Sequence, residues 1–264
     1  MVVMLIKKKK NGSTCLLLAA QNGYLDIVKY LCKIGCSSGE KNNCGFTPLI
    51  AASFSGHLEV VKYLLNNGSS IHEATIDGYT AFLAALYNNH FDIVEYLLNY
   101  GSSIHEASID GYTALLVTYV GNINGVIYFL NNGSSIREKN KFGDTPFLLA
   151  SYQGNLEIIN YLLQNGSSVH ERSNDGYSAL LGASYNNHLD VVSHLIKNGC
   201  SVQERNINGD TSLLLASYCG NIDTVKYLLN NGSSLKRKIR ITIFLLLMLQ
   251  RMDTIISFNF FMLK

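Results

Sequence analysis

The sequence repeats itself with a period of 33 residues. The segment from Ile71 to Ala81, IHEATIDGYTA, returns from Ile104 to Ala114 as IHEASIDGYTA. Glycines mark the same place in successive copies: Gly12, Gly45, Gly78, Gly111 and, after the loss of one residue, Gly143, Gly176 and Gly209. Self-similarity at this period is typical of stacked-repeat architectures, in which each unit contacts only its neighbours. We therefore expect one elongated solenoid and not a set of separate globular domains.

The glycine spacing also sets the predicted domain boundaries. Residues 1–8 fit the tail of an eroded preceding repeat, and residues 239–264 lack the Asp-Gly turn and the capping glycine of the other copies. We interpret residues 239–264 as a degenerate segment that caps the stack. Between them, residues 9–238 hold seven repeats: 9–41, 42–74, 75–107, 108–139, 140–172, 173–205 and 206–238.

Two other interpretations of the C-terminal segment stay open. The apolar run from Ile241 to Leu249 follows the basic residues Lys236, Arg237 and Lys238, so this segment could attach the protein to a membrane surface. A transmembrane helix needs about 20 apolar residues, which makes this run too short to cross a bilayer. A frameshifted remnant is the other interpretation.

Within one copy the local signals predict a hairpin arm followed by two helices. Asp77-Gly78 suits a tight turn with positive φ. Thr47-Pro48 predicts a helix start, with threonine as the capping residue and proline at the first helical position. A second helix follows, with an acidic first turn at Glu59 and an ending at Asn67-Gly68.

Taken together, these residues resemble a known family. The segment Gly45 to Ile71, GFTPLIAASFSGHLEVVKYLLNNGSSI, closely resembles the ankyrin repeat and its T-P-L-H-x-A signature. The resemblance covers about residues 9 to 238 and implies an all-α ankyrin-repeat solenoid of helix-turn-helix units with short β-hairpin arms. The chain departs from the signature at one position in several repeats, where apolar residues replace the histidine. We expect apolar packing at this position. The residues are Ile50, Leu83, Leu148, Leu181 and Leu214.

The fourth repeat departs from the others. Thr113 to Gly121 spans one residue fewer than Thr145 to Gly154, so its first helix lacks a position. Misfit packing of this kind costs about 1–3 kcal/mol. We predict a soft joint or a change of curvature near residues 113–125.

The six cysteines stand mostly where other copies carry ordinary repeat residues. This pattern indicates a cytoplasmic or other reducing intracellular compartment, which includes a host cell for a viral or bacterial effector. Cys32, Cys36 and Cys44 lie close in sequence, but their spacing matches no zinc-site pattern. We therefore expect no metal and no cofactor.

Charge separates the repeat body from its ends. Residues 11–235 hold 11 basic and 18 acidic residues, a formal charge of −7, whereas Lys7 to Lys10 and the C-terminal segment are basic. An acidic body repels nucleic acid and favours a basic protein partner.

Polar side chains recur in columns and form no catalytic constellation of nucleophile, base and orienting group. His57, His90 and His188 precede the second helix, and we interpret them as structural. A second column of histidines, His72, His105 and His170, precedes a column of glutamates. These glutamates either attract a basic partner or form a solvated face: Glu40, Glu73, Glu106, Glu138, Glu171 and Glu204.

The aromatic residues carry the sharpest functional signal. We use the name aromatic column for the residues that recur at the end of the first helix and just after the turn glycine, which in the ankyrin family line the concave groove where partners bind. Tyrosine and phenylalanine there either anchor a partner or stack on one another as an inherited structural ladder. The column comprises Phe46, Phe54, Tyr79, Tyr87, Tyr112, Tyr119, Tyr152, Tyr177, Tyr185 and Tyr218.

The predicted function follows from the resemblance and from the absence of a catalytic constellation. We expect a monomeric, non-enzymatic scaffold or adaptor that binds a protein partner through the aromatic column, and we expect no nucleic acid and no membrane. The alternative is a membrane-peripheral ankyrin protein attached through its basic and hydrophobic C-terminal segment.

Overall fold

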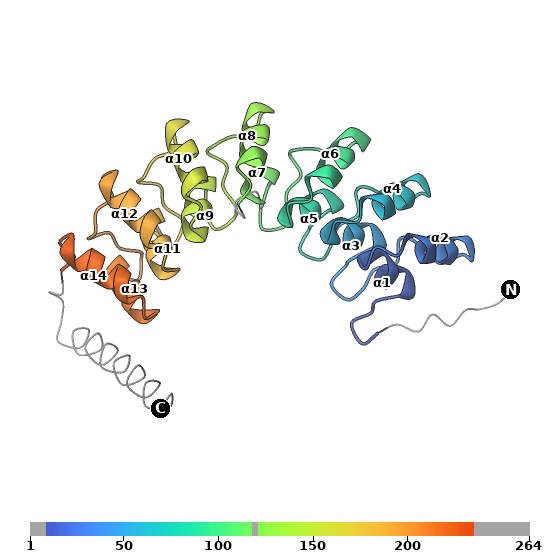
Figure 1. Ribbon diagram of the computed structural model, residues 1–264, viewed down its shortest axis with the longest axis horizontal. Helices are drawn as coiled ribbons and strands as arrows, with labels where there is room; N and C mark the ends of the chain where they lie inside the picture. The colour runs from blue at the N-terminus through green and yellow to red at the C-terminus, as the bar shows by residue number, and fades with distance from the viewer. Residues whose placement is uncertain (1–8, 118–120, 235–264) are drawn as a thin grey trace, which may run out of the picture. The chain divides into compact units, whose positions relative to one another are not determined.

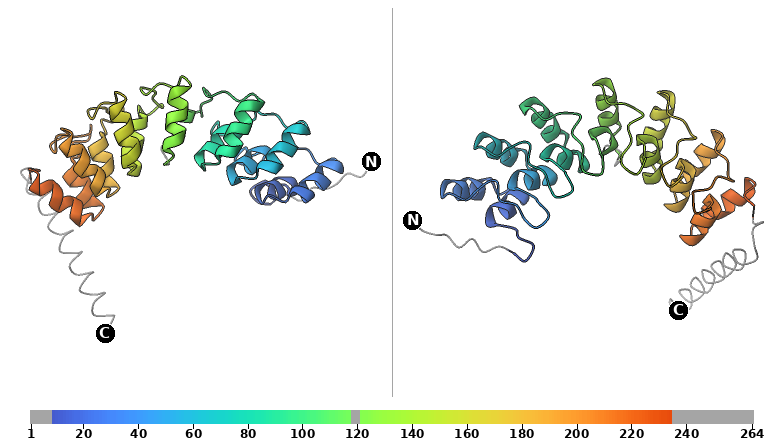
Figure 2. Two further views of the ribbon diagram at one scale, coloured as in Figure 1. Left: turned by 45° about the horizontal axis from the view of Figure 1, so that its top comes forward. Right: turned by 180° about the vertical axis from the view of Figure 1, so that it is seen from behind.

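Helices in antiparallel pairs form the described part of the chain (Figure 1). The computed structural model describes residues 9–117 and 121–234. The views in Figure 2 show the same pairing from other directions. The helices are α1 (Cys15–Gln21), α2 (Leu25–Lys33), α3 (Pro48–Ser55), α4 (Leu58–Asn66), α5 (Ala81–Tyr87), α6 (Phe91–Tyr100), α7 (Ala114–Val117), α8 (Ile123–Asn131), α9 (Pro146–Gln153), α10 (Leu156–Gln164), α11 (Ala179–Tyr185), α12 (Leu189–Lys197), α13 (Ser212–Tyr218) and α14 (Ile222–Asn230).

The first helix of each pair begins at a hydroxyl cap, as predicted. The Oγ1 of Thr47 accepts a hydrogen bond from the backbone N–H of Ile50 at 3.3 Å, and Pro48 takes the first helical position. Ser178 caps α11 in the same way. These bonds satisfy backbone donors that a helix start otherwise leaves unpaired.

The second helix of a pair ends at an asparagine whose side chain bonds back to the helix, and this bond recurs along the chain. The Nδ2 of Asn67 donates to the carbonyl oxygen of Tyr63 at 2.7 Å, four residues earlier. Gly68 follows with a φ of 89°, a left-handed conformation that favours glycine. The predicted Asn-Gly helix ending is therefore confirmed.

Short hairpins connect the pairs. The backbone N–H of Thr75 donates to the carbonyl of Tyr79 at 3.0 Å, and Ala74 and Thr80 form an antiparallel bridge. A Cβ on Gly78 would lie 2.6 Å from the backbone nitrogen of Ile109, in the next hairpin. That nitrogen donates to the carbonyl of Asp77 at 2.9 Å, so adjacent hairpins are held together through their backbones.

The core lies between first helices of adjacent repeats and beneath the second helices. Ile50, Leu83 and Leu181 are fully buried, which confirms that apolar packing occupies the place of the family histidine. Leu214, by contrast, is only half-buried. In the third and fourth repeats Phe82 and Phe129 are also fully buried, with ring centroids 6.2 Å apart in an edge-to-face arrangement.

The first repeat exposes positions that the other repeats bury. Ile27 in α2 is 49% exposed, whereas its counterparts Val60, Ile93 and Val191 are at most 2% exposed. Leu31 is likewise half-buried, although its counterparts in the later repeats are buried.

The chain divides into two units, residues 1–135 and residues 136–264. The division falls close to the end of the fourth predicted repeat, whose first helix is α7. Residues 118–120 lie outside the described residues, so the soft joint near residues 113–125 stays a prediction. The interpretations of residues 1–8 and 239–264 also fall outside the described part of the chain.

Candidate functional site

Rings of the aromatic column stack between neighbouring repeats. Phe54 and Tyr87, at the ends of α3 and α5, have centroids 6.3 Å apart and planes inclined by 16°. In the C-terminal unit, Tyr152 and Tyr185 stack with centroids 6.5 Å apart and an angle of 19°. Both separations fall in the range in which offset aromatic pairs attract.

The hairpin rings stand against this stack at right angles. Phe46 meets Phe54 with centroids 5.9 Å apart and an angle of 86°, and Tyr79 meets Tyr87 at 6.3 Å and 86°. Hairpin and helix aromatics in each of these repeats therefore form an edge-to-face corner. The structure brings these predicted site residues together, as the sequence pattern indicated.

Stacking leaves part of each helix ring open to solvent. Tyr87 is 40% exposed, Tyr152 is 44% exposed and Tyr218 is 65% exposed. The hairpin residues Phe46, Tyr79, Tyr112 and Tyr177 are half-buried, as is Tyr185, and Tyr119 lies outside the described residues. The two expectations for the column are therefore compatible, because residues whose rings stack on each other remain partly exposed.

Backbone anchors from the next repeat fix these rings. The carbonyl oxygen of Phe54 accepts a hydrogen bond from the Nδ2 of Asn88 at 2.6 Å and lies 3.2 Å from the Nε2 of His90. Tyr152 is held in the same way by Asn186 at 2.8 Å and His188 at 3.0 Å. The structural interpretation of the loop histidines is confirmed.

A glycine makes room for each anchoring imidazole. A Cβ on Gly154 would lie 2.4 Å from the Nδ1 of His188, and one on Gly56 would lie 2.5 Å from the Cε1 of His90. Both glycines have a φ of 82°, so the turn needs glycine for its conformation as well. The second histidine column differs, because His72, His105 and His170 are exposed.

Two residues of the glutamate column, Glu106 and Glu171, bond to other groups of their own repeats. One oxygen of Glu171 accepts from the backbone N–H of Ser168 at 2.8 Å, and the other accepts from the hydroxyl of Thr145, the cap of α9. Glu106 makes the same two bonds to Ser103 and Thr80. Glu106 and Glu171 are half-buried, and both carboxylate oxygens of each are bonded to the loop and to a helix cap, a structural role that the sequence pattern did not indicate.

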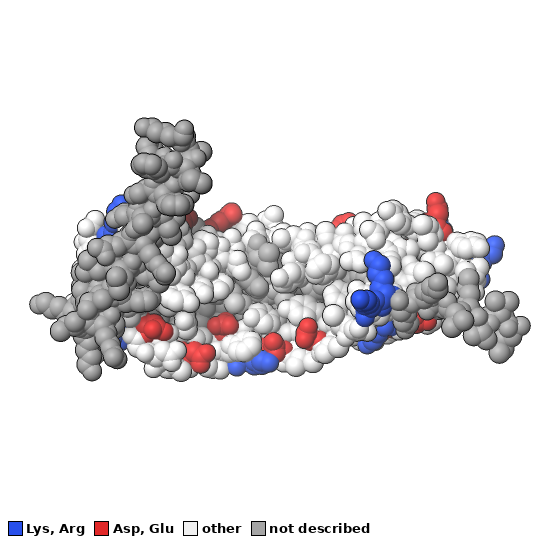
Figure 3. All heavy atoms as spheres, turned by 90° about the horizontal axis from the view of Figure 1, so that it is seen from below, with Lys and Arg blue, Asp and Glu red and all other residues white. Residues whose placement is uncertain are grey.

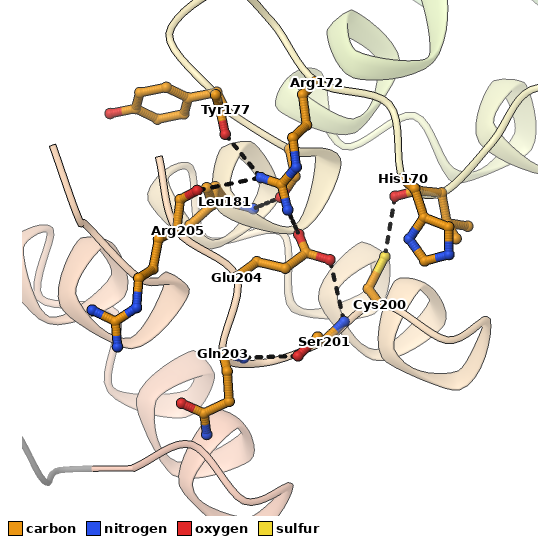
Figure 4. A network of polar contacts seen from close by, with 12 residues as sticks. His170, Arg172, Tyr177, Leu181, Cys200, Ser201, Gln203, Glu204 and Arg205 are labelled. Atoms are coloured by element: carbon orange, nitrogen blue, oxygen red, sulfur yellow. Dashed lines mark hydrogen bonds and ion pairs between the residues drawn. The ribbon is translucent and has the colours of Figure 1, made fainter. Parts of the chain in front are cut away.

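Arg172 adds an ion pair to this network in the C-terminal unit (Figure 4). Its Nη2 lies 3.6 Å from the Oε2 of Glu204, whose side chain is 7% exposed. Its Nη1 donates to the carbonyls of Gly176 at 3.0 Å and Arg205 at 3.3 Å. Arg172 thus ties two hairpins together with the buried carboxylate.

Comparison with known families agrees with this geometry. A family model described as ankyrin repeats (3 copies) matches residues 1–75, 69–140, 115–206 and 147–239. The chain belongs to the ankyrin-repeat family. No protein with curated annotation matches it. Ankyrin repeats generally act as protein–protein interaction modules, and the family is typically non-enzymatic.

The electrostatic surroundings of the ankyrin aromatic column differ between the two units. Burial, reinforced by the nearby Tyr112, Tyr87, Asp110 and Asp77, raises the pKa of Tyr79. Cys219 contributes most to raising the pKa of Tyr185, followed by Tyr152 and burial. Two carboxylates therefore contribute to the raised pKa of Tyr79 in the N-terminal unit, and none contributes to that of Tyr185. On the face shown in Figure 3, Asp and Glu side chains lie scattered near the edges of a largely uncharged surface, with Lys and Arg side chains among them.

Across residues 9–117 and 121–234, no group of three or more His, Cys, Asp or Glu side chains is placed to hold a metal ion. The same residues contain no helix that is both long and apolar enough to cross a membrane.

Sequence reasoning missed the asparagines that anchor the column. Asn88 and Asn186 each stand two residues before a loop histidine, in the repeated pattern Asn-Asn-His. The sequence shows that this pattern recurs, but it does not show which groups the asparagine side chains bind. A carbonyl 34 residues earlier becomes a neighbour only after the repeats stack.

Proposed function

We propose that this ankyrin chain is a non-enzymatic adaptor that binds a protein partner through the aromatic column. The observation that carries the proposal is the exposure of rings whose backbones are fixed. Tyr87 and Tyr152 present about two fifths of their surface to solvent, while the next repeat holds Tyr152 and the stacking partner Phe54 at their carbonyls. Rigid aromatic surface loses little conformational entropy on binding and is enriched among interface anchors.

The chemistry of the repeat body supports a basic partner. Residues 11–235 have a formal charge of −7, which speeds encounter with a positively charged surface and disfavours nucleic acid. We further propose that the protein acts as a monomer in a reducing compartment such as the cytoplasm. Free thiols at Cys15, Cys44 and Cys219 on the exposed surface are consistent with that setting.

Site-specific photo-crosslinking tests the proposal. A photoreactive phenylalanine analogue placed at Tyr87 or Tyr152 should crosslink a partner in the native cell. The matched control is the same analogue at Tyr128, which is 45% exposed but lies in α8, a second helix outside the column. Equal crosslinking of the same protein from all three positions, or from Tyr128 alone, would overturn the proposal.

A further inference from the structure

We propose that Asn208 is a site of spontaneous deamidation, at which the side-chain amide is converted to aspartate or isoaspartate without an enzyme. Asn208 precedes Gly209 in the hairpin of the seventh repeat. The reaction favours a glycine after the asparagine, because glycine has no Cβ to shield its backbone nitrogen from the neighbouring side chain. This inference goes beyond the proposed function and does not depend on it.

The reaction is an intramolecular acyl transfer that consumes one water. The backbone nitrogen of Gly209 loses its proton to hydroxide and bonds to the Cγ of Asn208. The Cγ–Nδ2 bond breaks, and ammonia leaves with a proton taken from water, so that a cyclic imide remains. Water then opens the imide at Cγ, which gives aspartate, or at the main-chain carbonyl carbon, which gives isoaspartate. Adjacent residues supply the nucleophile and the carbonyl, which favours the first step.

Most other Asn-Gly pairs of the chain are restrained by a side-chain hydrogen bond. At the ends of the second helices, the Nδ2 of each asparagine donates to the carbonyl oxygen four residues earlier at 2.7–2.8 Å. That bond ties the amide to the preceding helical turn and must break before the Cγ can meet the next backbone nitrogen. The helix-end asparagines restrained in this way are Asn67, Asn132, Asn165, Asn198 and Asn231.

The remaining pairs outside the seventh hairpin are also restrained. Asn11 and Asn22 use their side chains in hydrogen bonds of 3.1 and 2.8 Å. Asn124 lies in α8, where Gly125 is buried and its backbone N–H donates to the Oδ1 of Asn122 at 2.8 Å. In each of these pairs either the amide or the attacking nitrogen is held by another group.

Asn208 lacks such a restraint on its amide. It is exposed, and its side chain forms no hydrogen bond with any residue in 9–117 or 121–234. The N–H of Gly209 donates to the carbonyl of Asn206 at 3.0 Å, much as the N–H of Gly68 donates to that of Leu65 at 3.2 Å. The attacking nitrogen is therefore restrained to a similar degree in the hairpin and at the helix end, and the amide makes the difference.

The turn at Asn208 is also held on one side only, as far as the described residues extend. The N–H of Ile207 donates to the carbonyl of Asp175 at 3.0 Å and joins this hairpin to the preceding one, whereas the carbonyl of Asn208 accepts from no described residue. A Cβ on Gly176 would lie 3.2 Å from the nitrogen of Ile207, but one on Gly209 would have no described atom within 4 Å. A turn with fewer contacts opens locally at a lower free energy, which frees the N–H of Gly209.

Peptide mapping of the folded, full-length protein tests the proposal. During ageing in mildly alkaline buffer, mass spectrometry should find aspartate and isoaspartate at position 208 accumulating at least about fivefold faster than at each helix-end asparagine, the factor that one net hydrogen bond supplies. In concentrated urea these rates should converge, because the helix-end bonds are lost. Equal rates in the folded protein, an unchanged spread in urea, or aspartate formed at position 208 without isoaspartate would overturn the proposal.

Asp175→Asn provides a matched Asn-Gly pair in a turn that is held on both sides. The N–H of Asn174 donates to the carbonyl of Phe142 at 2.9 Å, and the carbonyl of Asp175 accepts from Ile207. The turn should persist, since Asn208-Gly209 forms the same turn. We expect the introduced amide to react about fivefold more slowly than Asn208 in the same molecule, because one further hydrogen bond must open. Reaction of the introduced amide as fast as that of Asn208 would overturn the assignment.

Deamidation would give the seventh hairpin the carboxylate that Asp77, Asp110 and Asp175 supply in other repeats. Isoaspartate would in addition lengthen the backbone of the turn by one methylene group. Asn208→Asp reproduces the charge without the longer backbone, and it should fold because Asp175-Gly176 forms the same turn, with a φ of 73° at the glycine. Its peptide should show no further mass increase on ageing. A continued increase in that peptide would place the reaction at another residue and overturn the proposal.

Discussion

The imidazole Nε2 of His188 lies 3.0 Å from the carbonyl oxygen of Tyr152, which belongs to the preceding repeat. The ring also fills the space that Gly154 leaves open. One side chain thus joins two repeats and fixes the backbone beneath an exposed aromatic ring.

Replacing His188 by alanine should destabilise the protein, because the substitution removes a hydrogen bond and leaves a gap beside Gly154. We expect a loss of about 1–2 kcal/mol in the free energy of unfolding, measured by urea denaturation. His170→Ala is the control, since His170 is exposed, and it should stay within about 0.5 kcal/mol of the unaltered protein. Equal losses for the two variants would show that the inter-repeat contact contributes nothing.

Gly182→Ala should stabilise the protein. Gly182 lies inside α11, and an added Cβ would lie 3.5 Å from the nearest atom, the Cδ2 of Tyr152, which is ordinary van der Waals contact. Alanine favours a helix interior over glycine by about 1 kcal/mol. We expect a rise of the order of 0.5–1 kcal/mol in the free energy of unfolding. Gly78→Ala is the contrasting variant and should destabilise, because its Cβ would lie 2.6 Å from a backbone nitrogen at a φ of 82°.

Cys200 should resist alkylation. It is 6% exposed, its Sγ donates to the carbonyl of Val169 at 3.6 Å, and burial raises the pKa of its thiol to about 12. At pH 8 very little thiolate forms, so iodoacetamide followed by mass spectrometry should modify Cys15 and Cys44, which are exposed, well before Cys200. Cys36 holds the same position in the first repeat, is half-buried, and should react at an intermediate rate.

The thiol of Cys200 should also make the free energy of unfolding depend on pH in the alkaline range. The folded chain holds the proton of Cys200 more tightly than the unfolded chain, whose thiol has the ordinary pKa of 9.0. The free energy of unfolding should therefore fall as the pH rises from 9 towards about 12, because the unfolded chain ionises first. Cys200→Ser should reduce this slope but not abolish it, because the pKa values of Tyr79 and Tyr185 are also raised in the folded chain. An identical alkaline slope in both proteins would rule out the thiol as its source.

Glu171→Ala should cost about 1–3 kcal/mol of stability, because it leaves the loop N–H of Ser168 and the cap of α9 without their shared acceptor. Glu157→Ala is the matched variant, since Glu157 is an exposed glutamate in the same unit. A smaller effect for Glu171 than for Glu157 in thermal unfolding would contradict the structural role of the glutamate column.

Hydrogen exchange tests the predicted joint in the fourth repeat. Backbone amides of residues 113–125 should exchange faster than those of residues 80–98, because the shortened first helix packs less well. Protection of the two segments to the same degree would refute the prediction.

Most of the fold follows from the sequence because its signals are local. Thr47-Pro48 specifies a helix start, Asn67-Gly68 a helix end and Asp77-Gly78 a turn, and each is confirmed. Their recurrence every 33 residues then fixes the stacking, because each unit must bury its apolar side chains against the next.

The site was predictable only in outline. The pattern located the aromatic column, but the direction of a polar side chain depends on neighbours that stacking creates. Glu171 points into its own repeat to reach Thr145, and Asn186 points back to Tyr152. Neither partner is adjacent in sequence, so residue type alone left these side chains free to face solvent or a ligand.

The links between repeats have a genetic consequence. His90 and His188 each reach a carbonyl 36 residues earlier, and Asn88 and Asn186 each reach one 34 residues earlier. A duplication or deletion of one complete period leaves each of these distances unchanged. Recombination between copies can therefore lengthen or shorten the protein and change the number of stacked rings it displays. An insertion or deletion out of phase shifts every such bond in the affected copy, and the fourth repeat carries a one-residue loss of that kind.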